Sequence, residues 1–319
     1  EAIMTQVLIN FDFPEEYIAA LSQKYPSLEF VKSTDKGEVF SYLPETEVLL
    51  TFFQCSKEIL DAAPKLKWVQ AITAGVDYMP LDVVSGRGII LTNGRGIHRI
   101  HMAEYALAAM VCLARSFHLM FRNQAKHKWD RTPPQGEIYG TTAGIVGLGE
   151  IGEEIAKKAS VFGMRVIGTK RSPAPVEYVD EIYGPQDMGT VFEKSDYVIN
   201  LLPYTDETHR LIDAKYFNLM DKNACFINIG RGKTVNEEDF AEALREKKIR
   251  AAVSDVFYDE PLPEDSPLWD MENLILTPHI CGQSPNYMKR ALEIIEHNLD
   301  VYVTGRGEMI NVVDPEAGY

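Results

Sequence analysis

The sequence lacks the closely spaced cysteines of a disulfide-rich secreted protein and the long apolar runs of a membrane protein. Its four cysteines, Cys55, Cys112, Cys225 and Cys281, are far apart and form no CxxC pair, so we expect reduced thiols in a cytoplasm. The longest apolar run, 105–114, has ten residues, whereas a transmembrane helix needs about 20. No basic segment followed by an apolar stretch occurs near the N-terminus, so we expect no signal peptide.

The chain also lacks an excess of basic residues. It has 32 Lys and Arg against 47 Asp and Glu, a net charge of −15, so neither nucleic acid nor an anionic membrane is an expected partner. A small anionic ligand must then be gathered by a local basic pocket. His98, His101, His118 and His127 have no Asp or Cys at metal-site spacing, so we predict no metal and interpret them as surface or interface histidines.

Length and periodicity indicate two α/β domains. The chain has 319 residues, which suits two domains of roughly 100–200 residues each. Short apolar strands alternate with helical segments, and this alternation predicts parallel sheets covered by helices. The expected strands are 7–9, 28–31, 48–52, 68–72 and 89–91, then 143–147, 165–169, 197–201, 225–229, 251–253 and 274–276. Long helices are expected over 102–126 and 285–303.

A glycine-rich turn follows the first strand of the second series. Gly147, Gly149 and Gly152, with Glu150 and Ile151 between the last two, fit GxGxxG between a strand and a helix. The first glycine permits the tight turn, the second lets a pyrophosphate approach the backbone, and the third allows close helix–strand packing. The helix N-terminus offers free N–H groups to the anion. This motif predicts a dinucleotide site.

The end of the next strand bears on the choice of dinucleotide. Lys170, Arg171 and Ser172 stand where an NAD site usually has a carboxylate, and the next acid is Glu177. Two cations and a hydroxyl suit a 2′-phosphate, so we predict NADP, with NAD as the alternative. The competing interpretations are solvated loop charges and a weakly selective site.

Three further segments complete a recognisable order of motifs. They are Asn228-Ile229-Gly230-Arg231-Gly232, a segment from Asp255 to Pro263 that includes Glu260, and Thr277-Pro278-His279-Ile280, each following an expected strand. With the glycine turn, they resemble the D-isomer-specific 2-hydroxyacid dehydrogenase family over nearly the whole chain. The resemblance implies that Arg231, Glu260 and His279 are the catalytic residues.

The chemistry of these side chains suits the reduction of a 2-keto acid independently of the resemblance. His279 can donate the proton, because its reference pKa of about 6.5 is close to neutrality. Glu260 would accept a hydrogen bond from the other ring nitrogen and favour the charged imidazole. Arg231 has a planar fork that matches a carboxylate and can polarise the keto group. Taken singly, Arg231 could equally be a surface or capping cation, Glu260 a turn residue and His279 a core or loop histidine.

The resemblance also implies further cofactor-binding and substrate-binding residues. It implies that Asp255 lies near the nicotinamide carboxamide and that Ala74 and Gly75, in the segment 73–77, hold the substrate carboxylate through backbone N–H groups. An ordinary strand-to-helix turn is the alternative for that segment. The remaining cofactor positions implied are Leu202, Pro203, Ile229 and Gly282.

Two suggestive residues receive less weight. Hydride transfer needs no thiolate, so we expect Cys281 to pack in the protein interior rather than act as a nucleophile. Trp129 is open between a wall of the substrate pocket, a subunit contact and packing in a core.

The resemblance also implies an architecture. It consists of two Rossmann-like or flavodoxin-like doubly wound parallel-sheet domains with a cleft between them. The substrate domain would comprise residues 1–96 with 286–319, and the dinucleotide-binding domain residues 97–285. The expected protein is a homodimer, formed through the cofactor domain.

The activity implied is reduction of a small 2-keto acid, of the glyoxylate or hydroxypyruvate type, to a D-2-hydroxy acid with NAD(P)H. Two alternatives remain open. A formate dehydrogenase shares the fold but has a Gln-and-His arrangement, against which Glu260 argues. A dinucleotide-sensing corepressor is a binding module that can retain the catalytic residues.

Overall fold

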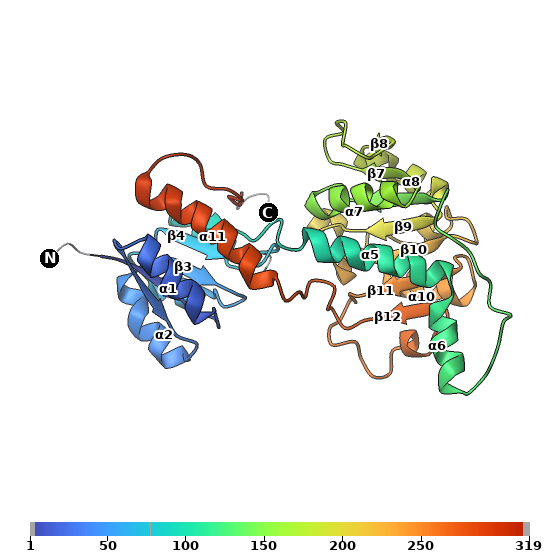
Figure 1. Ribbon diagram of the computed structural model, residues 1–319, viewed down its shortest axis with the longest axis horizontal. Coiled ribbons are helices and arrows are strands. Elements are labelled where there is room, and N and C mark those ends of the chain that lie inside the picture. The colour runs from blue at the N-terminus through green and yellow to red at the C-terminus, as the bar shows by residue number, and fades with distance from the viewer. Residues whose placement is uncertain (1–3, 77, 315–319) are drawn as a thin grey trace. The chain divides into compact units, whose positions relative to one another are not determined.

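The computed structural model describes residues 4–76 and 78–314. The chain forms two compact units, one of residues 1–97 with 284–319 and the other of residues 98–283. Each unit has one sheet of parallel strands with helices on it (Figure 1), so the expectation of two parallel-sheet α/β domains is confirmed. Which unit binds substrate and which binds cofactor stays a prediction.

The smaller unit has a five-stranded sheet in the order β2-β1-β3-β4-β5. Val7, Leu8 and Ile9 of β1 are fully buried, as expected for a parallel strand covered on both faces. The strands are β1 Thr5–Ile9, β2 Leu28–Lys32, β3 Thr46–Thr51, β4 Trp68–Ala71 and β5 Ile90–Thr92. The helices are α1 Glu15–Lys24, α2 Lys36–Tyr42, α3 Lys57–Ala62, α4 Leu81–Gly86 and α11 Tyr287–Thr304.

The larger unit has a seven-stranded sheet in the order β12-β11-β10-β9-β6-β7-β8. The strands are β6 Thr142–Val146, β7 Arg165–Thr169, β8 Glu181–Tyr183, β9 Tyr197–Asn200, β10 Cys225–Asn228, β11 Ala251–Ser254 and β12 Leu274–Leu276. The strand order reverses between β6 and β9, and open sheets bind ligands at the carboxyl ends of strands beside such a reversal. The sequence patterns missed β8, because its three residues are only half-buried.

The helices of the larger unit are α5 Arg99–Ala114, α6 Phe117–Ala125, α7 Glu150–Val161, α8 Met188–Lys194, α9 Ala214–Phe217 and α10 Glu237–Arg245. The prediction of one helix over 102–126 is wrong, because Ser116 has a left-handed backbone with φ +50° and separates α5 from α6. Its hydroxyl donates to the Pro134 carbonyl at 2.6 Å. That contact with the connector holds the chain in the break.

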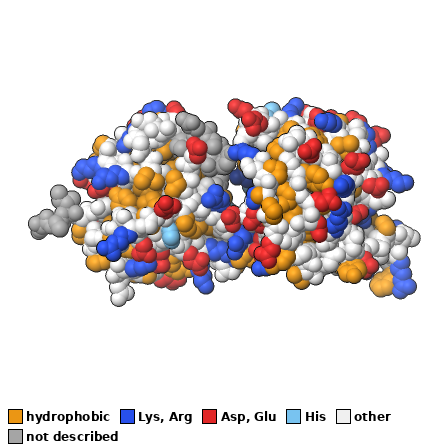
Figure 2. Space-filling model, turned by 90° about the horizontal axis from the view of Figure 1, so that it is seen from above, with side chains coloured by type: hydrophobic (Ala, Val, Ile, Leu, Met, Phe, Trp, Pro, Cys, Tyr) orange, Lys and Arg blue, Asp and Glu red, His pale blue; other side chains and the backbone are white. Residues whose placement is uncertain are grey.

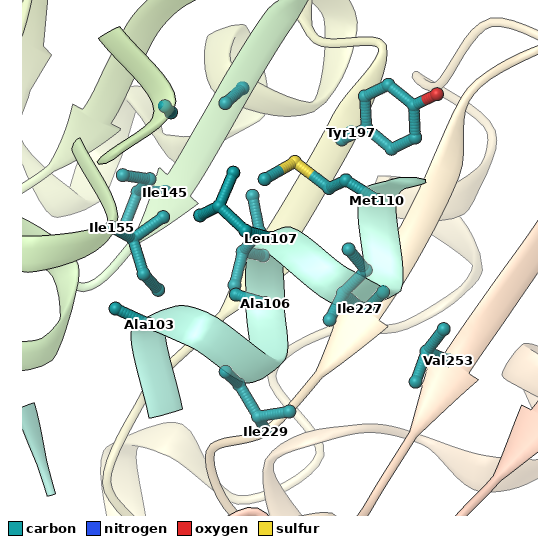
Figure 3. Close-up of a cluster of buried hydrophobic side chains, with 14 of the residues drawn as sticks. Ala103, Ala106, Leu107, Met110, Ile145, Ile155, Tyr197, Ile227, Ile229 and Val253 are labelled. Carbon is teal, nitrogen blue, oxygen red and sulfur yellow. The ribbon is translucent and has the colours of Figure 1, made fainter. Parts of the chain in front are cut away.

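Helix α5 forms much of the core of this unit. Its side chains Leu107 and Met110 are buried against β6, β9, β10 and β11 (Figure 3), and α5 also packs along α7 (Figure 1). The apolar run 105–114 therefore lies within a helix of a folded unit, and most of its residues are buried there. Among the described residues, no helix is long and apolar enough to span a membrane.

Charged side chains of both signs are spread over the face shown in Figure 2, with hydrophobic patches between them. Several large apolar side chains of the larger unit are strongly exposed. Trp129 is 88% exposed, so the interpretation that packs it in a core of this chain is wrong. Tyr139 and Val161 are 72% and 82% exposed.

Candidate active site

The glycine turn joins β6 to α7 as expected for a dinucleotide loop. Gly147 has φ +108°, a conformation that side chains rarely adopt, and its N–H donates to Thr169 Oγ1 at 3.1 Å. A Cβ on Gly152 would meet the Gly147 carbonyl oxygen at 2.5 Å, so only glycine lets the helix approach the strand this closely. A Cβ on Gly149 would meet nothing within 4 Å, which leaves open space beside that backbone.

The start of α7 fits the pyrophosphate of a dinucleotide. Gly149 is the N-cap residue and no side chain caps this end; Glu150 and Ile151 are the first two helical residues. The first N–H groups of a helix have no intrahelical partner, and they attract an anion together with the helix dipole. The open space at Gly149 leaves room for that anion.

The residues expected at the adenosine ribose follow β7. Lys170 is half-buried, while Arg171 and Ser172 are exposed. Lys170 Nζ lies 3.0 Å from Glu153 Oε1 on α7. A carboxylate missing from the loop itself is thus present on the neighbouring helix, a feature that the sequence pattern did not reveal.

The imidazole of His279 and the carboxylate of Glu260 form a hydrogen-bonded pair. His279 Nδ1 lies 2.6 Å from Glu260 Oε2, and Glu260 Oε1 accepts the Phe257 N–H at 2.9 Å. The two side chains are 49% and 33% exposed, so the pair is accessible to a ligand. Because Nδ1 faces the carboxylate, Nε2 is the ring atom that can reach another group.

This contact shifts both titrations. The hydrogen bond to Glu260 raises the pKa of the His279 imidazole; burial and the charge of Arg231 act in the opposite direction, and the charges of Glu260 and Asp255 add to the rise. Burial acts to raise the pKa of the Glu260 carboxyl, but the hydrogen bonds from His279 and Phe257 and the two nearby positive charges lower it. The charged form of each partner is thus favoured by the other.

Arg231 stands close enough to the pair for its charge to act on both titrations. It follows β10, while Glu260 follows β11 and His279 follows β12, and these three strands are neighbours in the sheet. Arg231 is half-buried, and its guanidinium donates through Nη1 to the Gly230 carbonyl at 3.1 Å. The structure thus brings together the three side chains that the motifs singled out.

The other positions that the resemblance implies for cofactor binding differ in how exposed they are. Leu202 is half-buried and Pro203 exposed, just after β9. Ile229 is 1% exposed and packs under α5 (Figure 3), so only its backbone is left for a ligand. Gly282 is half-buried and its carbonyl faces His101 Nε2 at 2.9 Å.

Asp255 is fully buried, and both carboxylate oxygens already accept hydrogen bonds. Oδ1 accepts from the Thr277 hydroxyl at 2.5 Å and the Ile280 N–H at 2.9 Å, and Oδ2 accepts from the Cys281 N–H at 2.9 Å. The carboxylate therefore anchors the loop that carries His279. The sequence patterns did not indicate this role.

Ala74 and Gly75 lie in the smaller unit, in the loop that follows β4. Both are half-buried, and the Ala74 carbonyl accepts from Asn93 Nδ2 at 2.9 Å. Asp77, in the same segment, lies outside the described residues. Their expected role toward a substrate carboxylate stays a proposal.

Among residues 4–76 and 78–314, no group of three or more His, Cys, Asp or Glu could hold a metal ion. Cys281 is 6% exposed and belongs to the core under α5, in agreement with the packing role expected of it, and burial raises the pKa of its thiol. His101 contributes to the loop contact described above, and His118 Nδ1 is a buried atom without a hydrogen-bond partner. Both histidines are partly buried, and their interpretation as surface or interface residues stays a prediction.

Comparison with known proteins agrees with this geometry. Residues 107–281 match the family described as "D-isomer specific 2-hydroxyacid dehydrogenase, NAD binding domain". The chain is 31% identical over 318 residues to a D-3-phosphoglycerate dehydrogenase of Methanocaldococcus jannaschii, covering 98% of this chain and 60% of the relative. It is 33% identical over 313 residues to a glyoxylate reductase of Korarchaeum cryptofilum, covering 94% and 93% of the two chains.

A solved structure shows the same likeness along the whole length. The structure is of an NADPH-dependent glyoxylate/hydroxypyruvate reductase from Sinorhizobium meliloti in complex with NADP and sulfate. It matches with a TM-score of 0.84 and 29% identity over 99% of this chain and 100% of that one. The chain spans only about 60% of the phosphoglycerate dehydrogenase relative. The matched domain, the similarity to the Korarchaeum relative along nearly its whole length and the fold show that the chain belongs to the D-isomer specific 2-hydroxyacid dehydrogenase family.

Proposed function

We propose that this protein uses NAD(P)H to reduce a small 2-keto acid to the D-2-hydroxy acid. The observation that carries the proposal is the 2.6 Å contact between His279 and Glu260, with the charge of Arg231 beside it. All three follow neighbouring strands in the unit that contains the glycine turn. Keto-acid reduction needs a proton donor, a group that keeps it charged and a cation for the carboxylate.

Each side chain has a defined task in this proposal. The bound nicotinamide supplies the hydride. His279 donates a proton from Nε2 to the carbonyl oxygen of the substrate, while Glu260 holds Nδ1 and stabilises the charged ring. Arg231 binds the substrate carboxylate with N–H groups other than the one bound to Gly230, since a guanidinium has five.

The backbone of Ala74 and Gly75 is proposed to complete the hold on the carboxylate. Backbone N–H groups next to small side chains form concave anion sites. This assignment comes from the family resemblance, and the half-burial of both residues is compatible with it.

We propose NADPH as the preferred cofactor and NADH as the weaker one. Lys170, Arg171 and Ser172 offer two charges and a hydroxyl to a 2′-phosphate, and the Sinorhizobium meliloti neighbour is NADPH-dependent by its description. The contact of Lys170 with Glu153 opposes this preference, because the carboxylate competes with the phosphate. The test is the ratio of kcat/KM for NADPH and NADH; a ratio in favour of NADH rejects the preference.

The proposed substrates are of the glyoxylate and hydroxypyruvate type. The Korarchaeum relative is named a glyoxylate reductase, and the Sinorhizobium neighbour a glyoxylate/hydroxypyruvate reductase. NADPH oxidation is measured over glyoxylate, hydroxypyruvate, 3-phosphohydroxypyruvate, pyruvate and branched 2-keto acids. His279→Ala should lower kcat by about 100-fold or more while cofactor binding, followed by NADPH fluorescence, persists. Absence of turnover with every acid in the wild type, or full turnover in His279→Ala, contradicts the proposal.

Two further proposals concern the oligomeric state of the protein and its cellular location. The family resemblance supports a homodimer through the cofactor domain, and exposed apolar side chains of the larger unit, such as Trp129, Tyr139 and Val161, are available for a contact. Light scattering after gel filtration measures the mass, and a monomer at micromolar concentration contradicts the dimer. All four cysteines are free thiols, which supports a location in the cytoplasm.

A further inference from the structure

The loop that presents His279 has a backbone that its surroundings must hold in place. His279 has φ +53°, a left-handed conformation that is unfavourable for a residue other than glycine. Its N–H donates to the Asp255 carbonyl at 2.8 Å. Such conformations persist at functional sites only where neighbouring contacts over-determine them.

Helix α5 supplies one of those contacts. The Tyr105 hydroxyl lies 2.6 Å from Thr277 Oγ1, and Thr277 Oγ1 lies 2.5 Å from Asp255 Oδ1. The Thr277 hydroxyl donates its single proton to Asp255 Oδ1. Tyr105 must then donate to Thr277, and burial, which raises the pKa of Tyr105, keeps its proton in place. The bonds run in one direction from the helix to the buried carboxylate.

The same helix also holds the far end of the loop. One turn before Tyr105, His101 Nε2 lies 2.9 Å from the carbonyl oxygen of Gly282. Since a carbonyl only accepts, this nitrogen carries a proton. Helix α5 therefore contacts residues 277 and 282, which flank His279 on both sides, and Asp255 binds the N–H groups of the residues between them.

We propose that Tyr105, acting through Thr277, is a positioning residue that fixes the direction of the His279 imidazole toward Glu260. This inference rests on the proposed function, because it assigns Tyr105 a task in presenting the proton donor. Neither hydroxyl has to touch the substrate. The 2.6 Å contact between His279 and Glu260 depends on where the loop places the ring, and the loop is held by α5 and Asp255.

A purely stabilising hydroxyl would give a different result, and Tyr197 provides the matched control. Tyr197 is 3% exposed in the same core as α5 and its hydroxyl lies 3.4 Å from Arg250 Nη2. It is the first residue of β9, at the end of that strand opposite the catalytic loops. Tyr197→Phe therefore removes a buried hydroxyl without altering the loop of His279.

The kinetic test compares Tyr105→Phe, Thr277→Val, the double variant and Thr277→Ser. We expect each of the first two to lower kcat about tenfold, as loss of a buried hydrogen bond allows, with KM and NADPH affinity unchanged. Because both act through one line of contacts, the double variant should be no slower than the slower single variant. Thr277→Ser keeps the hydroxyl and should retain most of the wild-type kcat, as should Tyr197→Phe.

A second measurement does not need turnover. NMR titration of the His279 ring reports its pKa, which Glu260 and Asp255 raise and Arg231 lowers. In Tyr105→Phe the contact with Glu260 weakens and the pKa of His279 falls toward its ordinary value, while in Tyr197→Phe it stays as in the wild type. A wild type that reduces no keto acid rejects the proposed function, and the ring titration still tests the positioning.

The proposal is overturned by any of three results. These are a Tyr105→Phe variant of an active wild type with unchanged kcat, an unchanged titration of the His279 ring in that variant, and equal losses in Tyr105→Phe and Tyr197→Phe. If Thr277→Val does not fold, Tyr105→Phe and Thr277→Ser still decide the matter.

Discussion

Replacing Glu260 by Gln separates the charge of this side chain from its shape. The amide has one acceptor oxygen, whereas the carboxylate uses two, one for His279 and one for the Phe257 N–H. The variant can satisfy only one of these donors. It also removes the negative charge that raises the pKa of the His279 imidazole, so the ring loses its proton at lower pH.

The magnitude follows from the exposure of the pair. A hydrogen bond to a charged group contributes about 1.5–3 kcal/mol when it is well shielded. The side chains here are 49% and 33% exposed, so solvent screening reduces the contribution to about 1 kcal/mol. Loss of this contribution destabilises the protonated ring, and we therefore expect the pKa of His279 to fall in Glu260→Gln.

The assay is the pH dependence of kcat/KM for keto-acid reduction with saturating NADPH. The reaction needs the protonated imidazole, so the rate falls as the pH rises through the pKa of His279, and in Glu260→Gln this fall begins at lower pH. Glu264→Gln, at an exposed position of the same loop, is the control and should keep the wild-type profile. An alkaline limb that does not move in Glu260→Gln refutes the reasoning.

The same pair has a signature in stability. The pKa of His279 is raised on folding, so its stabilising contribution is complete below the unfolded pKa of about 6.5 and is lost as the pH rises through the folded value. The pKa of Glu260 is lowered, so its contribution is present above the unfolded pKa of about 4.3 and is lost as the pH falls through the folded value. The difference in unfolding free energy between wild type and Glu260→Gln should therefore be largest between these limits.

Four further substitutions test the rest of the site. Arg231→Lys keeps the charge without the fork and should raise KM for the keto acid and lower kcat/KM by about tenfold or more; wild-type kinetics would remove Arg231 from its role. In Gly152→Ala the new Cβ would lie 2.5 Å from a backbone oxygen, so this variant should have an unfolding free energy lower by about 1–3 kcal/mol in a urea titration. Gly149→Ala should fold normally and bind NADPH more weakly, as measured by NADPH fluorescence. A stable Gly152→Ala together with an unstable Gly149→Ala contradicts the loop assignment. Glu153→Gln frees Lys170 and should lower KM for NADPH about two- to fivefold with KM for NADH unchanged; equal effects on both cofactors would mean that Lys170 does not contact the 2′-phosphate.

Much of this architecture can be predicted from local patterns. Buried parallel strands are apolar almost throughout, so runs such as 7–9 and 143–147 stand out from the polar helices between them. The roles of the glycines at 147 and 152 can also be predicted, because a positive φ in the turn and a close helix–strand approach exclude other residues. Arg231, Glu260 and His279 each follow a strand, and the carboxyl ends of neighbouring parallel strands meet at one edge of a sheet.

Other features depend on contacts between residues far apart in the chain. The break at Ser116 depends on the Pro134 carbonyl, and within the sequence the helical pattern simply continues past it. The charge of Lys170 is offset by Glu153 on another element, so the loop alone overstates how basic that position is.

The chain order of strands and helices is enough to predict the α/β class, since each element depends on local geometry. Arg231, Glu260 and His279 are singled out by the resemblance of their motifs to those of a known family. Tyr105 is the counterexample. Within an apolar helical run it looks like one more core residue, and its hydroxyl acquires a partner only when α5 packs beside the end of β12. Hydrogen bonds between distant segments arise from packing, and no local periodicity encodes them.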